Sequence, residues 1–496
     1  MRHKIISGEE LFDLIKSLTK AEKRNLKVLT KKEKGEKFYI RLFDLLNAQE
    51  VYDETAVLKK LRQQKTRKNY SLAKKYLFEK IIASLHGMGT YKYADSKVRD
   101  LIETATLLRS KGLYNQARRY LELADAEAIE ADTLFNRFAV NFWSYAFALN
   151  STDTRTSLME KTEELNRTGK QLLAKAEEYL NIYHIFRLVR STQIANPFCR
   201  STEEQEKLSA LVAPLLALDY EKIFSVGSRI HYHIALHIYH SMLARHQESL
   251  AHCKELISLV KAHPKIDNSV YPQLSNYLGE AIKARQFEDF ENYLAEFYEG
   301  IRTVPDFHEK KLIYERWLLY QIKYLIHRGD FEAVIRLMES ERDRTQAYSP
   351  LTRYIYFQIM YHLSVACFFS GNYPESWRHI MKILNEADSS QDIYIYAKIF
   401  SLIILYERNE ADLLPHALRS AYRSLLRRER LYKAEKNILD FIRHTQAVSS
   451  RKEAVDLFRE LAGNLERSFE DPFEQAIQYY FDILRWLRIK TSGKPS

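Results

Sequence analysis

Glycine and proline are scarce in this chain of 496 residues. With 13 glycines and 10 prolines, each makes up roughly 2–3% of the residues, against roughly 7% and 5% in average proteins. Because few residues interrupt helices, we expect few tight turns and long helices. Alternating runs of β-branched residues, which would indicate strands, are hard to find. The composition therefore predicts an all-α protein.

Cysteine is also scarce. The only three cysteines, Cys199, Cys253 and Cys367, are far apart in the sequence, which argues against a disulfide framework and against a thiolate zinc site. The first residues place charges close to every apolar side chain, unlike a signal peptide. No segment reaches the roughly 18 uncharged apolar residues of a membrane span. We therefore expect a cytoplasmic protein without a membrane partner.

Positive charge is present in excess at one end of the chain only. The formal net charge is +11, and residues 1–100 hold 24 Lys and Arg against 13 Asp and Glu. The remaining residues contain 52 basic and 52 acidic side chains. A basic segment of this kind suits nucleic acid or an acidic protein as its partner.

A short motif recurs along the chain: a glycine, an aromatic residue two positions later, and a small residue three positions further on. Clear copies begin at Gly112, Gly329 and Gly371. Two weaker copies begin at Arg245 and Arg285, so that the last four anchors are 40, 44 and 42 residues apart. This regular spacing indicates an internal repeat.

The chemistry of the motif predicts a hairpin of two helices. Glycine adopts the left-handed conformation that ends a helix, the aromatic ring fills the space between the paired helices, and the small residue lets them approach. Another weak copy lies near Asn409. Between 112 and 245 there is room for about three further hairpins.

This arrangement resembles the tetratricopeptide-repeat family over roughly residues 95–450. The period of about 42 is longer than the family's roughly 34, and the family's tryptophan and proline are mostly missing. HEAT-type repeats have a similar period but lack this turn motif. The resemblance implies an α-solenoid of antiparallel helix hairpins over residues 95–490, forming a right-handed superhelix with a concave binding face. An apolar helix over 472–490 would cap it, and 491–496 would be a disordered tail.

The same resemblance implies which side chains face the inside of the superhelix. They form a mixed aromatic and cationic surface that suits an extended protein or peptide segment with some acidic character. The candidate groove residues are Arg109, Tyr232, Tyr239, Arg316, Lys323, Gln358 and Tyr361. The Lys/Asn arrangement with which chaperone-binding members of the family hold a C-terminal carboxylate is not found.

Residues 1–94 are expected to form a basic N-terminal helical bundle. Thr19 and Glu22 are spaced as a capping box. Two helices flank a lysine-rich loop at 62–69, loosely like a helix-turn-helix, although the loop exceeds the roughly 3–4-residue turn of that motif. The candidate patch for nucleic acid or an acidic partner is Arg62, Lys65, Arg67, Lys68, Lys74 and Lys75. A solvated lysine-rich surface is the alternative interpretation.

Motifs that would indicate catalysis or a cofactor are not found. His233, His237 and His240 share one helix face at a spacing that can chelate a metal, but no carboxylate or cysteine lies on that face. Packing histidines are therefore the favoured interpretation, and we predict no metal and no cofactor. The phosphate-binding loop, the nucleophile elbow and HExxH are all absent. We do not expect an enzyme.

Two functional hypotheses remain. The first is a non-enzymatic scaffold or adaptor that binds a protein or peptide on the concave face of the solenoid. The alternative is a peptide-responsive regulator with a nucleic-acid-binding N-terminal domain, because the layout resembles that of bacterial peptide-responsive regulators.

Overall fold

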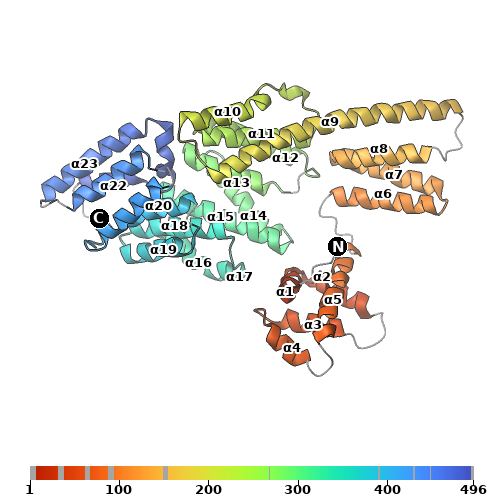
Figure 1. Cartoon of the computed structure of the whole chain (residues 1–496), viewed down its shortest axis with the longest axis horizontal. Coiled ribbons are helices and arrows are strands. Elements are labelled where there is room, and N and C mark those ends of the chain that lie inside the picture. Colours follow the sequence, from red (N-terminus) through yellow and green to blue (C-terminus); the bar gives the residue numbers. More distant parts are fainter. Residues whose placement is uncertain are drawn as a thin grey trace. The chain divides into compact units, whose positions relative to one another are not determined.

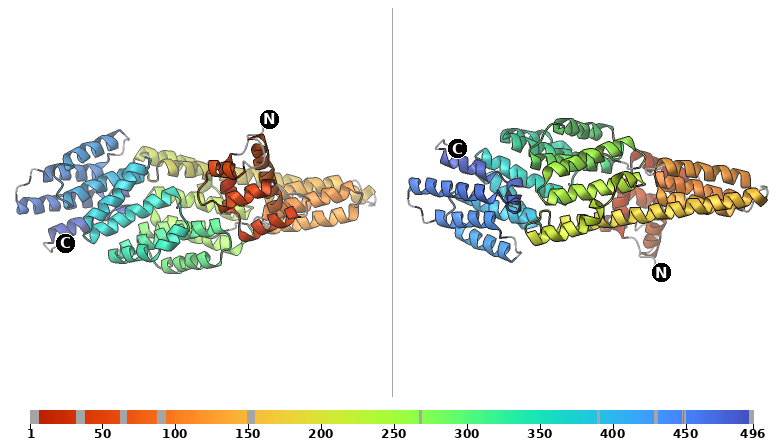
Figure 2. Two further views of the ribbon diagram at one scale, coloured as in Figure 1. Left: turned by 90° about the horizontal axis from the view of Figure 1, so that it is seen from below. Right: turned by 90° about the horizontal axis from the view of Figure 1, so that it is seen from above.

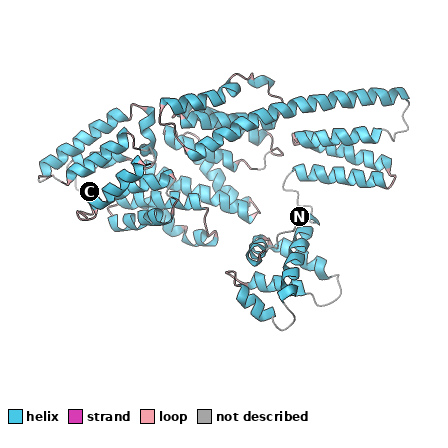
Figure 3. Ribbon diagram, viewed as in Figure 1, coloured by secondary structure: helices cyan, strands magenta, loops and turns pink. Residues whose placement is uncertain are grey.

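The protein is built from helices and the loops that join them. A computed structural model describes residues 7–31, 38–61, 67–87, 94–148, 155–266, 269–388, 391–427, 431–446, 448 and 450–492. No strand occurs within these residues (Figure 3), so the predicted all-α class is confirmed. The chain divides into two compact units, Met1–Lys97 with Arg302–Leu312 and Val98–Ile301 with Ile313–Ser496.

The first unit contains a small helical core. Its N-terminal helices are α1 (Gly8–Ser17), α2 (Lys20–Lys31), α3 (Phe38–Ala48), α4 (Glu54–Leu61) and α5 (Arg67–Gly87). Helices α1, α2 and α3 pack on α5 and bury apolar side chains such as Leu42 and Phe43. The predicted capping box is confirmed: the Thr19 hydroxyl accepts the Glu22 amide at 3.2 Å, and the Glu22 carboxylate accepts the Thr19 amide at 2.7 Å.

The second unit consists of helices that pack mainly on their neighbours in sequence (Figures 1 and 2). The helices from Ala94 onward are α6 (Ala94–Ser110), α7 (Tyr114–Glu130), α8 (Leu134–Ala148), α9 (Arg155–Ala195), α10 (Thr202–Leu216), η1 (Tyr220–Lys222), α11 (Val226–Met242), α12 (His246–Ala262), α13 (Tyr271–Ala284), α14 (Phe290–Thr303), α15 (Phe307–Arg328), α16 (Phe331–Ser340), α17 (Arg342–Ala347), α18 (Arg353–Phe369), α19 (Tyr373–Glu386), α20 (Asp392–Glu407), α21 (Leu414–Leu426), α22 (Lys433–Thr445), α23 (Arg451–Ser468), η2 (Pro472–Tyr479) and α24 (Ile483–Thr491). Pairs such as α11–α12 and α18–α19 are joined by turns of a few residues and pack along their length.

Left-handed residues end the first helix of these pairs. The three predicted glycines all have positive φ, between 75° and 77°. Arg285 and Asn409 are left-handed as well, with φ of 55° and 56°. After each turn, an amide donates to the carbonyl five residues earlier, as from Asn372 to Cys367 at 2.9 Å. This bond is the signature of the Schellman helix ending, so the turns predicted at 112, 285, 329, 371 and near 409 are confirmed.

Two predictions about the turns were wrong. The turn expected at Arg245 is made by Ala244 (φ 56°), one residue earlier. The stretch between the first and second anchors does not hold three hairpins: it contains a left-handed turn at Asp132 (φ 49°) and then α9, a single helix of 41 residues.

One pair of positions is buried at six of the turns: the residue seven before the left-handed residue and the residue five after it. The pairs are Ala105 and Ala117, His237 and Ser249, Leu278 and Phe290, Ile322 and Val334, Ser364 and Ser376, and Leu402 and Leu414. Where both are polar they bond across the hairpin, as Ser364 does to Ser376 at 2.9 Å. These hairpins therefore share one close-packed position, even where the sequence motif is weak.

The C-terminal segment, residues 472–491, does not form the single helix that its apolar pattern predicts. It forms η2, breaks at 480–482, and restarts as α24 with the Asp482 side chain accepting the Arg485 amide. Between the two helices, Tyr480 stacks on Tyr396 of α20 with ring centroids 4.1 Å apart, and Phe481 lies 4.6 Å from Phe400. This segment thus packs across helices far from it in the sequence.

A buried ion pair also joins distant parts of the second unit. Arg200, between α9 and α10, lies 3.0 Å from the Glu435 carboxylate of α22, and both side chains are at most 3% exposed. The Arg200 guanidinium also donates to the Tyr396 hydroxyl and stacks on the Tyr432 ring at 3.7 Å. Contacts in this unit are therefore not confined to sequence neighbours.

Candidate functional site

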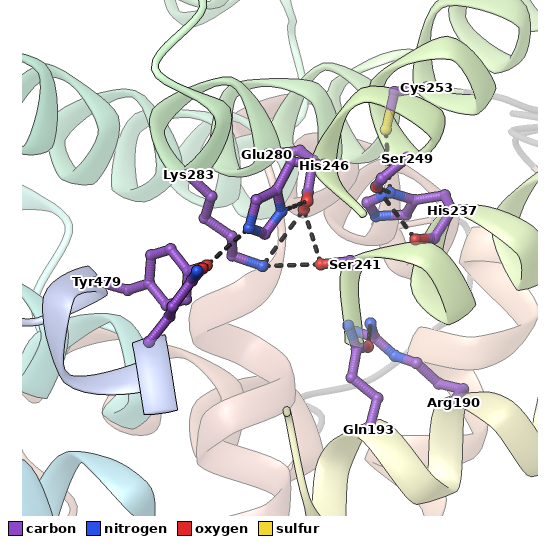
Figure 4. A network of polar contacts seen from close by, with 11 residues as sticks. Arg190, Gln193, His237, Ser241, His246, Ser249, Cys253, Glu280, Lys283 and Tyr479 are labelled. Carbon is purple, nitrogen blue, oxygen red and sulfur yellow. Dashed lines mark hydrogen bonds and ion pairs between the residues drawn. The ribbon is translucent and has the colours of Figure 1, made fainter. Parts of the chain in front are cut away.

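A buried polar network joins α11, α12, α13 and the C-terminal segment (Figure 4). Its centre is Glu280, which is 2% exposed. The carboxylate accepts the Ser241 hydroxyl at 2.7 Å, contacts His246 Nδ1 at 2.5 Å and lies 3.3 Å from the Lys283 ammonium. The other ring nitrogen of His246 lies 2.7 Å from the Tyr479 hydroxyl.

The charge on Glu280 is well compensated. Burial acts to raise the pKa of Glu280, but Lys283 and His246 outweigh it and lower the pKa to about 2. Lys283 also donates to the Ser241 hydroxyl at 2.8 Å. The Ser241 hydroxyl donates to a carboxylate whose pKa is lowered, and such a carboxylate is a weak base. The network holds three helices and the C-terminal segment together.

A second group, His237, Ser249 and Cys253, contains residue types found in catalytic sites. His237 Nδ1 lies 2.8 Å from the Ser249 hydroxyl and 3.1 Å from the Cys253 sulfur (Figure 4). Burial lowers the pKa of His237 to about 4 and raises the pKa of the Cys253 thiol well above its usual value. A neutral thiol beside a neutral imidazole, both buried, is not an activated nucleophile.

Beside the network lies a group of positively charged side chains, here called the cationic cluster: Arg190 of α9, Lys283 of α13, and Arg316 and Lys323 of α15. In addition to burial, the positive charge of Arg316 lowers the pKa of Arg190. Burial and the positive charge of Lys283 likewise lower the pKa of Lys323. In the part of the chain that the structure describes, no carboxylate lies within ion-pair distance of Arg190, Arg316 or Lys323. The cluster therefore holds uncompensated positive charge.

Helix α15 lies beside α13, where the Tyr320 hydroxyl is 3.3 Å from the Ser275 hydroxyl, and the positive charges on these helices act on one another. Desolvation and the Lys283 ammonium lower the pKa of Lys323 to about 8. Desolvation and Arg316 lower the pKa of Arg190, whose side chain bonds Gln193 at 2.6 Å. Tyr354 of α18 interacts with Arg190 and is 57% exposed. Solvent, and therefore a ligand, reaches this part of the cluster.

His362 of α18 lies next to Lys323. It is 4% exposed, and neither ring nitrogen has a hydrogen-bond partner among the described residues. Burial and the Lys323 ammonium lower the pKa of His362 well below its usual value. A buried polar group without a partner is rare in folded proteins, and here it adjoins uncompensated charge.

Of the predicted groove residues, the structure brings together Arg316 and Lys323. Arg109 lies elsewhere, with its guanidinium 5.1 Å from the centre of the Phe147 ring. Tyr232 is half-buried beside Tyr220. The other three, Tyr239, Gln358 and Tyr361, are buried inside the unit. Tyr239 bonds Ser209 at 3.1 Å, and Tyr361 packs against Tyr480 of the C-terminal segment.

The basic patch predicted in the first unit is described only in part. Arg62 and Lys65 lie outside the described residues, as do the side chains of Arg67 and Lys68 at the start of α5. Lys74 is buried, with its ammonium 4.9 Å from the Tyr70 ring and 3.9 Å from Glu54. Lys75 is exposed and lies 3.8 Å from Glu79.

Two of the three histidines of α11, His233 and His240, contact a fourth, His252 of α12, whereas His237 is turned toward Ser249. His233 Nδ1 lies 3.0 Å from His252 Nδ1, whereas His237 bonds Ser249 and His240 stacks on His252. Within the described ranges, no group of three or more His, Cys, Asp or Glu side chains is arranged to hold a metal ion.

Sequence reasoning missed Arg190, Lys283, Tyr354 and His362. Arg190 lies on α9, in the stretch where hairpins were expected but no motif could be read. The inner-face register was taken from the resemblance, and it was applied to neither α9 nor α13. Arg316 and Lys323, seven residues apart on α15, were the readable part of the cluster.

Comparison with known proteins adds no family. A scan against models of known protein families found no match, and neither did a search of curated proteins. Among the described residues, no helix combines the length and the apolarity needed to cross a lipid bilayer.

Proposed function

We propose that this protein is a non-enzymatic scaffold or adaptor that binds a protein or peptide on the concave face of a tetratricopeptide-like solenoid. The observation that carries the proposal is the recurring hairpin, with left-handed turns at 244, 285, 329, 371 and 409. Stacked hairpins of this kind form extended inner surfaces suited to a peptide or a partner helix. The neutral, buried state of His237 and Cys253 supports a role in packing.

The cationic cluster supports the choice of surface. Its cations come from α9, α13 and α15, and Tyr354 of α18 beside it is exposed. Side chains from several hairpins that meet at one solvent-accessible place are what a binding face of a helical repeat requires.

Photo-crosslinking in the cell of origin tests this function. A photoreactive phenylalanine analogue at Tyr354 is expected to capture a defined partner protein. The same analogue at Glu332, an exposed residue of α16, should not capture it. Equal capture of the same proteins from both positions, or no capture from Tyr354, would contradict the proposal.

A second function rests on the charge of the N-terminal segment. The excess of basic residues within 1–100 supports a regulator whose N-terminal unit binds nucleic acid. Mobility-shift assays with the full chain, duplex DNA and increasing salt test it. Binding should weaken on Lys75→Glu and steeply with salt; no shift even at low salt would rule it out.

A further inference from the structure

We propose that the cationic cluster binds an acidic peptide segment, with side-chain carboxylates of the peptide placed on Arg190, Arg316 and Lys323. This inference rests on the proposed function, because the occupant is taken to be a peptide. It adds the chemistry of the ligand and the residues that hold it.

The first argument is the missing counter-charge. Other cations of the second unit lie beside a carboxylate, as Lys261 does beside Glu296 at 2.8 Å. Among the described residues, Lys283 is the one member of the cluster with a carboxylate partner, Glu280. Like charges gathered without counter-charges repel each other and destabilise a fold. An anionic ligand would remove that repulsion.

The second argument is access. The Arg190 side chain is exposed, Arg316 and Lys323 are half-buried, and Tyr354 is exposed. Arginine presents a planar set of donors that matches a carboxylate in a two-point contact, while lysine acts as a point charge. In a partly desolvated place, such charge-assisted bonds are stronger than on an open surface.

The third argument is the buried polar group beside the cluster. His362 is 4% exposed and both of its ring nitrogens lack partners among the described residues. It lies close enough to Lys323 for the ammonium to act on its charge. A bound polar ligand, or the water it orders, would give this ring the partner that the described residues do not supply.

The charge balance favours a short acidic segment over a nucleic acid. Outside residues 1–100 the chain carries equal numbers of acidic and basic side chains. Nucleic acids are bound by extended positive surfaces that contact many phosphates. Three cations without a carboxylate partner among the described residues, in an otherwise neutral body, fit a few carboxylates better.

Binding of a defined probe tests the inference. The full-length protein is titrated into a fluorescein-labelled 12-residue peptide with four consecutive glutamates, and anisotropy is measured at low and physiological salt. We expect saturable binding that Arg316→Gln and Lys323→Gln each weaken by about tenfold, because each removes a charge-assisted bond. Arg119→Gln on α7, an exposed arginine with the same change of charge, should leave binding unchanged.

Three outcomes would overturn the inference: no binding of the glutamate peptide, equal binding by all variants, or tighter binding of a 12-nucleotide RNA with the same sensitivity to Arg316→Gln. Circular dichroism of each variant shows whether the fold is intact. If Tyr354 captures a partner that both variants still bind, the ligand chemistry is wrong but the scaffold function stands. If the peptide binds as expected and Tyr354 captures no partner, the scaffold function is contradicted, whereas the affinity of the cluster for acidic peptides stands.

Discussion

His362 illustrates how burial sets the protonation of single residues in this protein. Burial lowers the pKa of His233, His237 and His379 to about 4 and that of His252 to about 3. These rings are neutral in the folded protein at pH 7. In the unfolded chain they bind protons below about pH 6.5, so acid favours unfolding.

Replacing His362 by phenylalanine should reduce this acid sensitivity. Because the pKa of His362 is lowered in the folded state, stability falls as the pH drops below about 6.5, by up to about 1.4 kcal/mol per pH unit for one proton. His362→Phe removes that proton and the two unpartnered nitrogens. We expect unchanged or higher stability at pH 7 and a smaller loss at pH 5, measured by urea unfolding. An identical loss at pH 5 in wild type and variant would refute this, and His308→Gln at an exposed position serves as control.

Lys323 should react unusually well with amine reagents. Desolvation and Lys283 lower its pKa to about 8, so that a substantial share is neutral at pH 7.5, and only the neutral amine attacks acylating reagents. At substoichiometric acetylation we expect Lys323 to be modified ahead of the exposed Lys75, as measured by peptide mass spectrometry. Preferential labelling of Lys75 would contradict the lowered pKa.

At the scale of elements, some of the hairpin turns could be predicted from the sequence and others could not. Glycine marks three of them because it adopts positive φ at little cost. Asparagine at 409 and aspartate at 132 are weaker signals, because these residues adopt positive φ more readily than most, and alanine at 244 carries no signal. The one-residue error at 244 followed from this. Packing of the paired helices balances the strain at these turns. Ser249, and not Leu250, is the small residue at the close approach.

Substitutions at two matched turns test this account. No atom lies within 4 Å of a methyl group added at Gly371, where φ is 75°, so Gly371→Ala adds backbone strain alone and should destabilise by about 1 kcal/mol. At Ala244 the reverse change, Ala244→Gly, should raise stability by up to about 1 kcal/mol. Thermal unfolding of both variants measures the shifts. Effects of the same sign at the two turns would count against left-handed strain as their cause.

The C-terminal segment shows why periodicity alone misjudges an element. Its apolar side chains predict one amphipathic helix over 472–490. Tertiary contacts decide the structure instead. The Tyr479 ring packs on Phe198, the Tyr480 ring on Tyr396, and the Phe481 ring on Phe400. Tyr480 also packs against Tyr361, a predicted groove residue that is buried. Pairings between residues more than eighty positions apart leave no local sequence pattern that would predict them.

At the scale of the whole molecule, the Arg200–Glu435 pair is a strong test of how the second unit is held together. Removing one partner of a buried ion pair leaves an uncompensated charge, which costs about 3–5 kcal/mol. We therefore expect Arg200→Met to destabilise strongly.

The double variant Arg200→Met with Glu435→Met should recover most of that loss, because no buried charge remains. Urea unfolding of the wild type, the two single variants and the double variant forms a complete cycle. If the two single effects simply add in the double variant, the pair is not coupled and this account of the fold is wrong.

The same pair sets a limit on how this protein could change in evolution. Repeat proteins commonly gain or lose whole units between their ends. Here Arg200 and Glu435 form an ion pair although several hairpins lie between them in the sequence. The pair can form only if the number of these intervening hairpins stays the same. Duplicating or deleting one of these hairpins would move the two charges apart and leave each buried without its partner. Growth of the chain by whole units is therefore expected only outside the stretch from 200 to 435.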